Sequence, residues 1–296
     1  MRAVVVSAYP RRASQLAQRL DALGHAPRAV LTPRRPQGLR YAPHRPSGHS
    51  SQALPARLDV LELRDKELIP ALLRAYQPDV VVSWGVPWLV QPEALSVPPF
   101  GWLNLHPSAL PKHRGPTPLP WALRAGDPVI GVTWHRMDSG FDTGPVFAQG
   151  LVPTSELDPA RPWHKLTPLA MGLLPAALAR VTAGEAGDPQ READATYEGR
   201  FEFDEFARID PAQPARDILH QVTAWRLAKT KGPFRGPVLE LDGEDHRVVS
   251  VSLDEPRAPH GCPAVKVADG VLWITKSVPL GCRLRPKGVA GAPGEE

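Results

Sequence analysis

Short apolar runs rich in valine alternate with helical patterns along the first 84 residues, and this alternation constrains the fold more than any other feature. Helices are predicted over residues 13–23 and 65–76. Strands are predicted over residues 2–7, 28–32, 58–63 and 79–84. Strands that alternate with helices form parallel sheets, because each helix returns the chain to the same end of the sheet. The sequence therefore predicts an α/β domain with a mainly parallel sheet.

The second part of the chain first continues this pattern and then changes. Further strands are predicted over 101–106, 131–137 and 145–152, with helices near 117–126 and 164–184. After Arg200, one helical segment (214–227) precedes four short strand-like runs, VLELDG, HRVVSVSL, AVKVADG and VLWITKS, which turn residues separate. We therefore expect a catalytic domain over 1–200 and a smaller β-rich, OB-like domain over 201–282. The Pro-, Gly- and charge-rich tail, 283–296, is expected to be disordered.

Several common chemistries are excluded by missing motifs. The first strand-to-helix turn reads SAYPRRAS, so it lacks the glycines that let a backbone approach a dinucleotide pyrophosphate. There is no P-loop, G-x-S-x-G elbow or H-E-x-x-H motif, and two cysteines make neither a disulfide framework nor a zinc cluster. We expect no metal. No charged-then-apolar leader opens the chain and no apolar stretch is long enough to span a bilayer, so a cytoplasmic protein is expected.

Polar residues with catalytic potential lie at the end of the strand at 101–106. Asn104 and His106 are two residues apart, so both side chains face the same side of that strand. Pro107 ends the strand, which places the pair at its carboxyl end, where ligands bind in open α/β sheets. Asp142 lies in a D-S-G-F-D-T-G turn after another strand. An amide, an imidazole and a carboxylate suit direct acyl transfer to an amine. Each residue alone also fits an ordinary turn or core role.

The sequence N-L-H-P-S-A-L-P-K-H-R-G, followed by G-V-T-W-H-R-M-D-S-G-F-D-T-G, resembles the folate-dependent formyltransferase family, and within it most closely the branch that formylates methionyl-tRNA. The resemblance is strongest over residues 79–152. It implies a Rossmann-like formyltransferase domain and 10-formyltetrahydrofolate as the co-substrate. It also implies that Asn104 and protonated His106 stabilise the oxyanion that forms when an amine attacks the formyl carbon. Asp142 would hold His106 and assist proton removal.

The same resemblance implies binding residues. The folate would lie along the segment from Ser83 to Leu89 and the 138–142 loop. The expected contacts are Ser83, Trp84, Gly85, Val86, Trp88, Leu89 and Asp138. Trp84 and Trp88 fit a core role equally well. Contacts to the acceptor are expected from Arg114, Ser108 and His135. Arg114 alternatively folds its loop, and the Ser108 hydroxyl alternatively bonds the backbone of a proline turn.

The acceptor is left open by the sequence. Residues 22–58 contain no acidic residue but six arginines, and the resemblance assigns the loop 33–57 to initiator methionyl-tRNA. A solvated basic loop is the alternative. Pro107, the Trp134-His135 pair and the acidic residues of the second domain depart from the tRNA branch, and they favour a smaller amine, such as an amino sugar, a hydroxylated amino acid or a biosynthetic intermediate. A hydrolase that transfers the formyl group to water and a non-catalytic nucleic-acid-binding module are further alternatives.

Overall fold

The computed structural model describes residues 1–33, 58–228, 235–256 and 262–280. The chain divides into two compact units. The first comprises residues 1–122 and 127–201, and the second comprises 123–126 together with the chain from Glu202 onward. The predicted basic loop, apart from Pro33, and the predicted tail lie outside the described residues.

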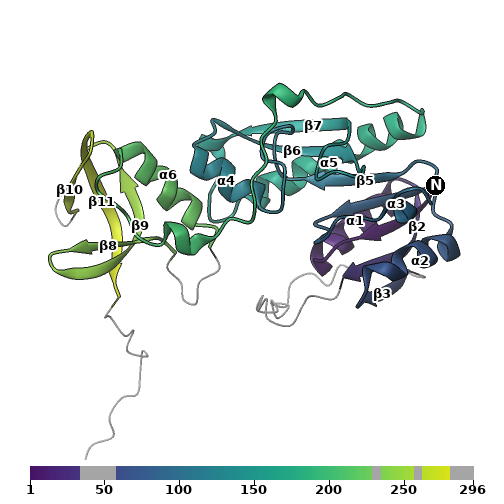
Figure 1. The fold of residues 1–296 in the computed structure, drawn as a ribbon, viewed down its shortest axis with the longest axis horizontal. Coiled ribbons are helices and arrows are strands. Elements are labelled where there is room, and N and C mark those ends of the chain that lie inside the picture. The colour runs from purple at the N-terminus through teal and green to yellow at the C-terminus, as the bar shows by residue number, and fades with distance from the viewer. Residues whose placement is uncertain (34–57, 229–234, 257–261, 281–296) are drawn as a thin grey trace, which may run out of the picture. The chain divides into compact units, whose positions relative to one another are not determined.

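A seven-stranded sheet with the order β3-β2-β1-β4-β5-β6-β7 forms the centre of the first unit (Figure 1). Its first five strands are parallel, and β6 and β7 are antiparallel to their neighbours. The strands are β1 (Arg2–Val6), β2 (Ala26–Pro33), β3 (Asp59–Leu63), β4 (Val80–Trp84), β5 (Trp102–His106), β6 (Val129–Arg136) and β7 (Val146–Pro153). The mainly parallel, Rossmann-like sheet predicted from the sequence is confirmed.

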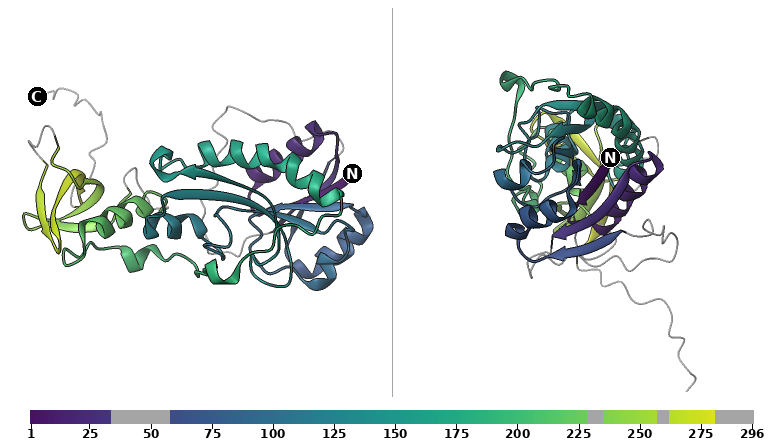
Figure 2. Two further views of the ribbon diagram at one scale, coloured as in Figure 1. Left: turned by 90° about the horizontal axis from the view of Figure 1, so that it is seen from above. Right: turned by 90° about the vertical axis from the view of Figure 1, so that its right-hand side faces the viewer.

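Helices cover both faces of this sheet. The helices are α1 (Pro10–Ala22), α2 (Ile69–Tyr76), α3 (Pro92–Leu95), α4 (Pro118–Ala125) and α5 (Trp163–Thr182), with 3₁₀ turns η1 (Lys66–Leu68), η2 (Thr154–Glu156) and η3 (Glu192–Asp194). Arg19 of α1 donates to the carbonyl oxygen of Met171 in α5, so these two helices share one face, with α2 on the other (Figure 2). Helix α1 begins at Pro10, earlier than predicted, because proline fits the first turn of a helix.

The alternation of side chains along β4, β5 and β6 separates an apolar face from a polar one. Val82, Leu105 and Trp134 face α1 and α5, and the indole nitrogen of Trp134 donates to the carbonyl oxygen of Ala170 at 2.9 Å. The opposite face carries an apolar cluster under α2 and α3, to which Val81 and Trp102 belong. Towards the carboxyl ends of β4 and β5, this second face becomes polar. The fold thus buries a small group of polar side chains beside a large apolar core.

The second unit contains a four-stranded antiparallel sheet and one helix. The strands β8 (Val238–Leu241), β9 (Glu244–Ser252), β10 (Ala264–Val267) and β11 (Gly270–Pro279) are ordered β10-β11-β9-β8. Helix α6 (Ala215–Trp225) follows the 3₁₀ turn η4 (Phe203–Phe206), and residues of α6 and the sheet share one apolar cluster. Asp242 and Gly243 join β8 to β9 with positive φ at both positions, as a type I′ hairpin turn requires. The β-rich second part predicted from the sequence is confirmed.

Among the described residues, no helix is both long enough and apolar enough to cross a membrane.

Candidate active site

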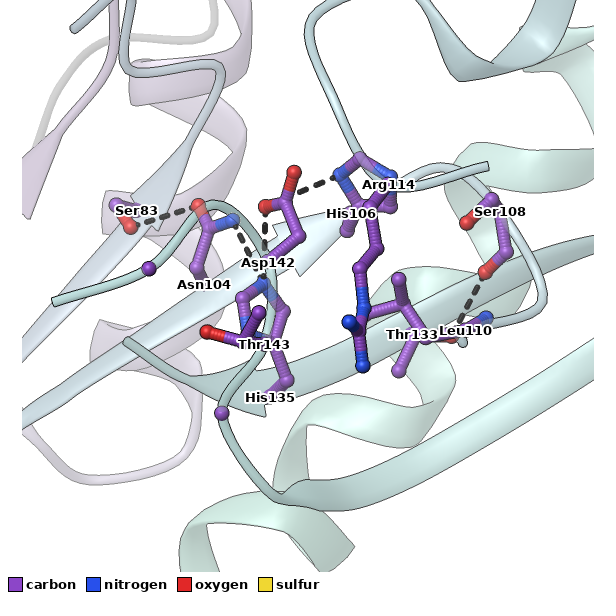
Figure 3. A network of polar contacts seen from close by, with 12 residues as sticks. Ser83, Asn104, His106, Ser108, Leu110, Arg114, Thr133, His135, Asp142 and Thr143 are labelled. Atoms are coloured by element: carbon purple, nitrogen blue, oxygen red, sulfur yellow. Dashed lines mark hydrogen bonds and ion pairs between the residues drawn. The ribbon is translucent and has the colours of Figure 1, made fainter. Parts of the chain in front are cut away.

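Asn104 and His106 lie together at the carboxyl end of β5, as the sequence predicts (Figure 3). Both residues are almost fully buried, with 5% and 4% of their surface exposed. Asp142, from the loop between β6 and β7, joins them. Its Oδ1 atom is 3.4 Å from Nδ1 of His106. The three candidate catalytic residues therefore form one cluster, although His106 and Asp142 are 36 positions apart along the chain.

The amide of Asn104 has a partner at each end. Its Oδ1 atom accepts a hydrogen bond from the Ser83 hydroxyl at 2.9 Å. Its Nδ2 atom lies 3.1 Å from Nε2 of His135, which is directly opposite Asn104 in the β5–β6 register. One Nδ2 hydrogen can serve this contact, which leaves the second hydrogen to donate to a ligand.

The two ring nitrogens of His106 have different surroundings. Nε2 donates to the carbonyl oxygen of His113 at 2.8 Å, so the neutral ring keeps its lone pair on Nδ1, which faces Asp142. Burial lowers the pKa of His106, while the Asp142 carboxylate and the His113 carbonyl act in the opposite direction. The neutral ring can therefore take up a proton at Nδ1, and the carboxylate would then stabilise the imidazolium.

Asp142 has a φ of +56°, a backbone conformation uncommon for residues other than glycine, although aspartate tolerates it better than most. Burial alone would raise its pKa. The charge of His106, the contact with His135 and a 3.0 Å hydrogen bond from the Gly115 N–H to Oδ2 outweigh burial and lower the pKa of Asp142 to about 2. Asp142 is thus ionised at neutral pH.

The loop that carries Asp142 is organised by its own side chains. Asp138 Oδ1 accepts hydrogen bonds from the Gly140 N–H and the Thr143 hydroxyl, at 3.0 and 2.6 Å. Gln190 donates to the carbonyl oxygens of Asp142 and Gly144, at 2.8 and 2.7 Å. Gln190 therefore fixes the turn from outside, and Asp138 fixes it from within.

The residues expected to contact the acceptor are engaged within the fold. The Arg114 guanidinium binds both carboxylate oxygens of Glu192, at 2.7 and 3.0 Å, and also donates to Gln190. The Ser108 hydroxyl donates to the carbonyl oxygen of Lys112 at 2.7 Å. His135 is 1% exposed. These contacts agree with the loop-folding alternatives for Arg114 and Ser108, and acceptor contacts from these residues stay predictions.

The residues expected to bind the folate lie on two faces of the sheet. Ser83 bonds Asn104, whereas Trp84 points to the opposite face, where its ring centroid is 5.4 Å from that of Trp163. Val86 and Trp88 lie against the apolar cluster under α2 and α3. Gly85 has a φ of +75°, and Leu89, four residues later, is 39% exposed. Binding by this segment stays a prediction, and any contribution of Trp84 on the Asn104 side would come from its main chain.

Three groups that complete the cluster are not indicated by the sequence. They are the Gly115 N–H, the His113 carbonyl oxygen and the Gln190 side chain. The first two are main-chain groups, which no residue pattern reveals. Gln190 is 48 residues from Asp142 and belongs to no motif. Over the described part of the chain, no three His, Cys, Asp or Glu side chains come together in a way that could hold a metal ion.

Comparison with known proteins identifies clear relatives. The family model described as "Formyl transferase" matches residues 1–161. The methionyl-tRNA formyltransferase of Chloroflexus aggregans is 32% identical over 273 residues, which cover 83% of this chain and 85% of the relative. Among solved structures, WlaRD, a sugar 3N-formyl transferase determined in the presence of dTDP and 5-N-formyl-THF, has a TM-score of 0.63 at 15% identity, covering 96% of this chain and 99% of WlaRD. HypX from Aquifex aeolicus in complex with tetrahydrofolic acid has a TM-score of 0.61 at 18% identity, covering 94% of this chain and 44% of HypX.

Proposed function

The chain belongs to the formyl transferase family, and from this premise we propose that it moves the formyl group of 10-formyltetrahydrofolate to the amine of initiator methionyl-tRNA. The observation that carries the proposal is the meeting of Asn104, His106 and Asp142 at the carboxyl end of β5. The hydroxyls of Ser83 and Ser108 donate to other groups of the protein. The cluster thus offers donors and a proton acceptor for direct transfer to an incoming amine.

We expect the segment 85–89 to contact the folate. Val86 and Trp88 pack against the apolar cluster under α2 and α3, Leu89 is 39% exposed, and the buried indole N–H of Trp88 has no hydrogen-bond acceptor among the described residues. Apolar side chains with an unpaired donor among them suit a heteroaromatic ring. When bound, 10-formyltetrahydrofolate supplies a formyl carbon attached to nitrogen. Main-chain groups of 85–89 and the 138–142 loop would hold the ring system in this proposal.

In this proposal each residue of the cluster has a step in the transfer. The second Nδ2 hydrogen of Asn104 donates to the formyl oxygen as negative charge develops there. The acceptor nitrogen forms its bond to the formyl carbon and loses a proton, which Nδ1 of His106 takes up. Asp142 stabilises the resulting imidazolium. The same proton can then pass to the folate nitrogen as its bond to the formyl carbon breaks.

The choice of acceptor follows sequence similarity. A methionyl-tRNA formyltransferase at 32% identity that matches most of the chain favours the tRNA acceptor. One observation favours a small amine, such as an amino sugar, as a second candidate. Residues 201–282 contain 12 acidic and 10 basic residues, so this part of the chain carries no excess positive charge for phosphates. The loop 33–57 would supply the basic contacts to tRNA, and the cytoplasm is the location that this acceptor implies.

A formyl-transfer assay tests these alternatives. The full chain would be incubated with 10-formyltetrahydrofolate alone, with charged initiator tRNA, or with a nucleotide-linked amino sugar, and tetrahydrofolate release would be measured. Release only with tRNA, together with formylmethionyl-tRNA by mass spectrometry, supports the proposal. Release only with the amino sugar supports the second candidate, and release without an acceptor indicates a hydrolase. No release under any condition contradicts the proposed function. The His106→Ala variant is the matched control and should release about 10²–10³-fold less.

A further inference from the structure

His135 lies opposite Asn104 and contacts two of the three candidate catalytic residues. Its Nε2 atom is 3.1 Å from Nδ2 of Asn104 and 3.5 Å from Oδ1 of Asp142. The other ring nitrogen, Nδ1, is 3.1 Å from the carbonyl oxygen of Arg136. Since the ring is 1% exposed and both nitrogens have partners in the protein, its contacts are to the cluster itself.

These contacts determine where the ring carries its proton. A carbonyl oxygen only accepts hydrogen bonds, so the Arg136 carbonyl requires a hydrogen on Nδ1. In the neutral ring, Nε2 then presents a lone pair, and the Asn104 amide must donate to it. The main chain of β6 thus makes His135 an acceptor towards Asn104.

The lone pair on His135 Nε2 determines the orientation of the Asn104 amide. With Nδ2 towards His135, Oδ1 accepts from the Ser83 hydroxyl at 2.9 Å. The flipped amide would place Oδ1 against the Nε2 lone pair of His135, where two acceptors repel. A serine hydroxyl can accept as well as donate, so Ser83 alone does not fix the orientation. His135 is the partner that selects it.

We propose that His135 is a positioning residue, which orients the Asn104 amide so that its second Nδ2 hydrogen faces the formyl oxygen. Asp142 Oδ1 lies 3.5 Å from the same Nε2 atom, and it would accept a hydrogen bond there only from a ring that carries a hydrogen on Nε2, which is the arrangement that nitrogen NMR spectra distinguish from the proposed one. The proposal rests on the proposed function for the chemical step. It replaces acceptor binding as the role of this histidine.

Kinetics of paired variants test the proposal. His135→Leu keeps the size of the side chain and removes the hydrogen-bond acceptor of Asn104. We expect its kcat to fall roughly 10- to 100-fold, with the KM for 10-formyltetrahydrofolate within about 3-fold of the wild-type value. His135→Gln, whose carbonyl can accept from Asn104, should recover most of this loss. His164→Leu, at an exposed position of α5, is the matched control and should retain full activity.

The decisive comparison uses the Asn104→Ala background. If His135 acts through the Asn104 amide, His135→Leu should cost less than about 3-fold in kcat there, because the orientated group is already gone. An equal loss in both backgrounds would overturn the proposal. So would a raised KM for the acceptor with unchanged kcat, which would return His135 to acceptor binding.

A measurement without turnover separates this inference from the proposed function. Nitrogen NMR of ¹⁵N-histidine-labelled protein at neutral pH should show His135 with a hydrogen on Nδ1 and a bare Nε2. The Asn104 side-chain amide protons should shift in His135→Gln. An Nε2 that carries a hydrogen would overturn the positioning role, even in a protein that transfers formyl groups. The expected spectrum in a protein that releases no tetrahydrofolate would contradict the proposed function alone. The spectra also cover the case in which His135→Leu fails to fold.

Discussion

Replacing His106 with glutamine should raise the pKa of Asp142. In the folded protein, burial raises this pKa, and the charge of His106 is the largest of the influences that lower it to about 2. Glutamine occupies a similar volume without a charge. Burial is then opposed by the contact and charge of His135 and by the Gly115 N–H, without the largest lowering influence, so the carboxyl group should hold its proton at a higher pH.

The size of the effect follows from the shift in the folded protein. The pKa of Asp142 falls from 3.8 to about 2, which corresponds to about 2 kcal/mol in favour of the carboxylate. At pH 3 a group with a pKa of about 2 is roughly nine-tenths ionised, whereas a group with a pKa of 3.8 is roughly one-seventh ionised. Because the folded pKa is depressed, this stabilisation is present above about pH 4 and is lost as the pH falls from about 4 to about 2.

Carbon NMR of the aspartate carboxyl groups measures the ionised fraction directly, with Asp142→Asn providing the assignment. We expect a carboxylate signal for Asp142 at pH 3 in the wild type and a largely protonated one in His106→Gln. His164→Gln, on the exposed surface of α5, should leave the signal unchanged. A wild-type Asp142 that is mostly protonated at pH 3, or equal fractions in both proteins, would refute the electrostatic coupling of the pair.

Other substitutions test how the loops around the pair are held. Gly144→Ala would drive a Cβ into the Arg136 carbonyl oxygen, so the Asp142 turn must move, and kcat should fall about 100-fold. Gly172→Ala, in α5 with open space around the new Cβ, should instead raise the free energy of unfolding by about 0.5–1 kcal/mol in urea titrations. Arg114→Lys loses the planar fork that binds Glu192, and kcat should fall about tenfold with an unchanged acceptor KM, whereas a raised acceptor KM would indicate direct binding. Asn104→Ala should keep its melting temperature and lose about 10²–10³-fold in kcat, and an active variant would contradict its role as donor.

The sequence predicts the site residues that belong to a short local pattern, such as a strand with its two-residue period or a turn. Asn104 and His106 follow the two-residue period of a strand that Pro107 ends, and Asp142 lies in a glycine-rich turn. The same period places Ser83 and Trp84 on opposite faces of β4, but only the register with β5 shows that Ser83 is on the side of Asn104. Adjacent residues in the predicted folate segment therefore cannot all line one surface with their side chains.

The fold was predictable for a related reason. Alternating strands and helices identify the parallel part of the sheet, because each element has its own period. The antiparallel order of β6 and β7 is not encoded in this way, since a buried strand has the same pattern in either direction. That reversal matters for the site, because it brings His135 opposite Asn104.

The partners of His106 are set by a segment far from it in sequence. Gln190 holds the Asp142 turn, while Thr196 accepts a hydrogen bond from the His113 N–H at 2.8 Å. The His113 ring lies between Asp127 and Glu198, at 3.0 and 3.1 Å, and its φ of +56° directs the carbonyl that accepts from His106. Residues 190–198 therefore fix both groups that flank the His106 ring, the carboxylate at Nδ1 and the carbonyl at Nε2. Because one segment holds both, a change there should disturb the protonation and the orientation of His106 together, although none of its residues lies in the motif that carries the chemistry.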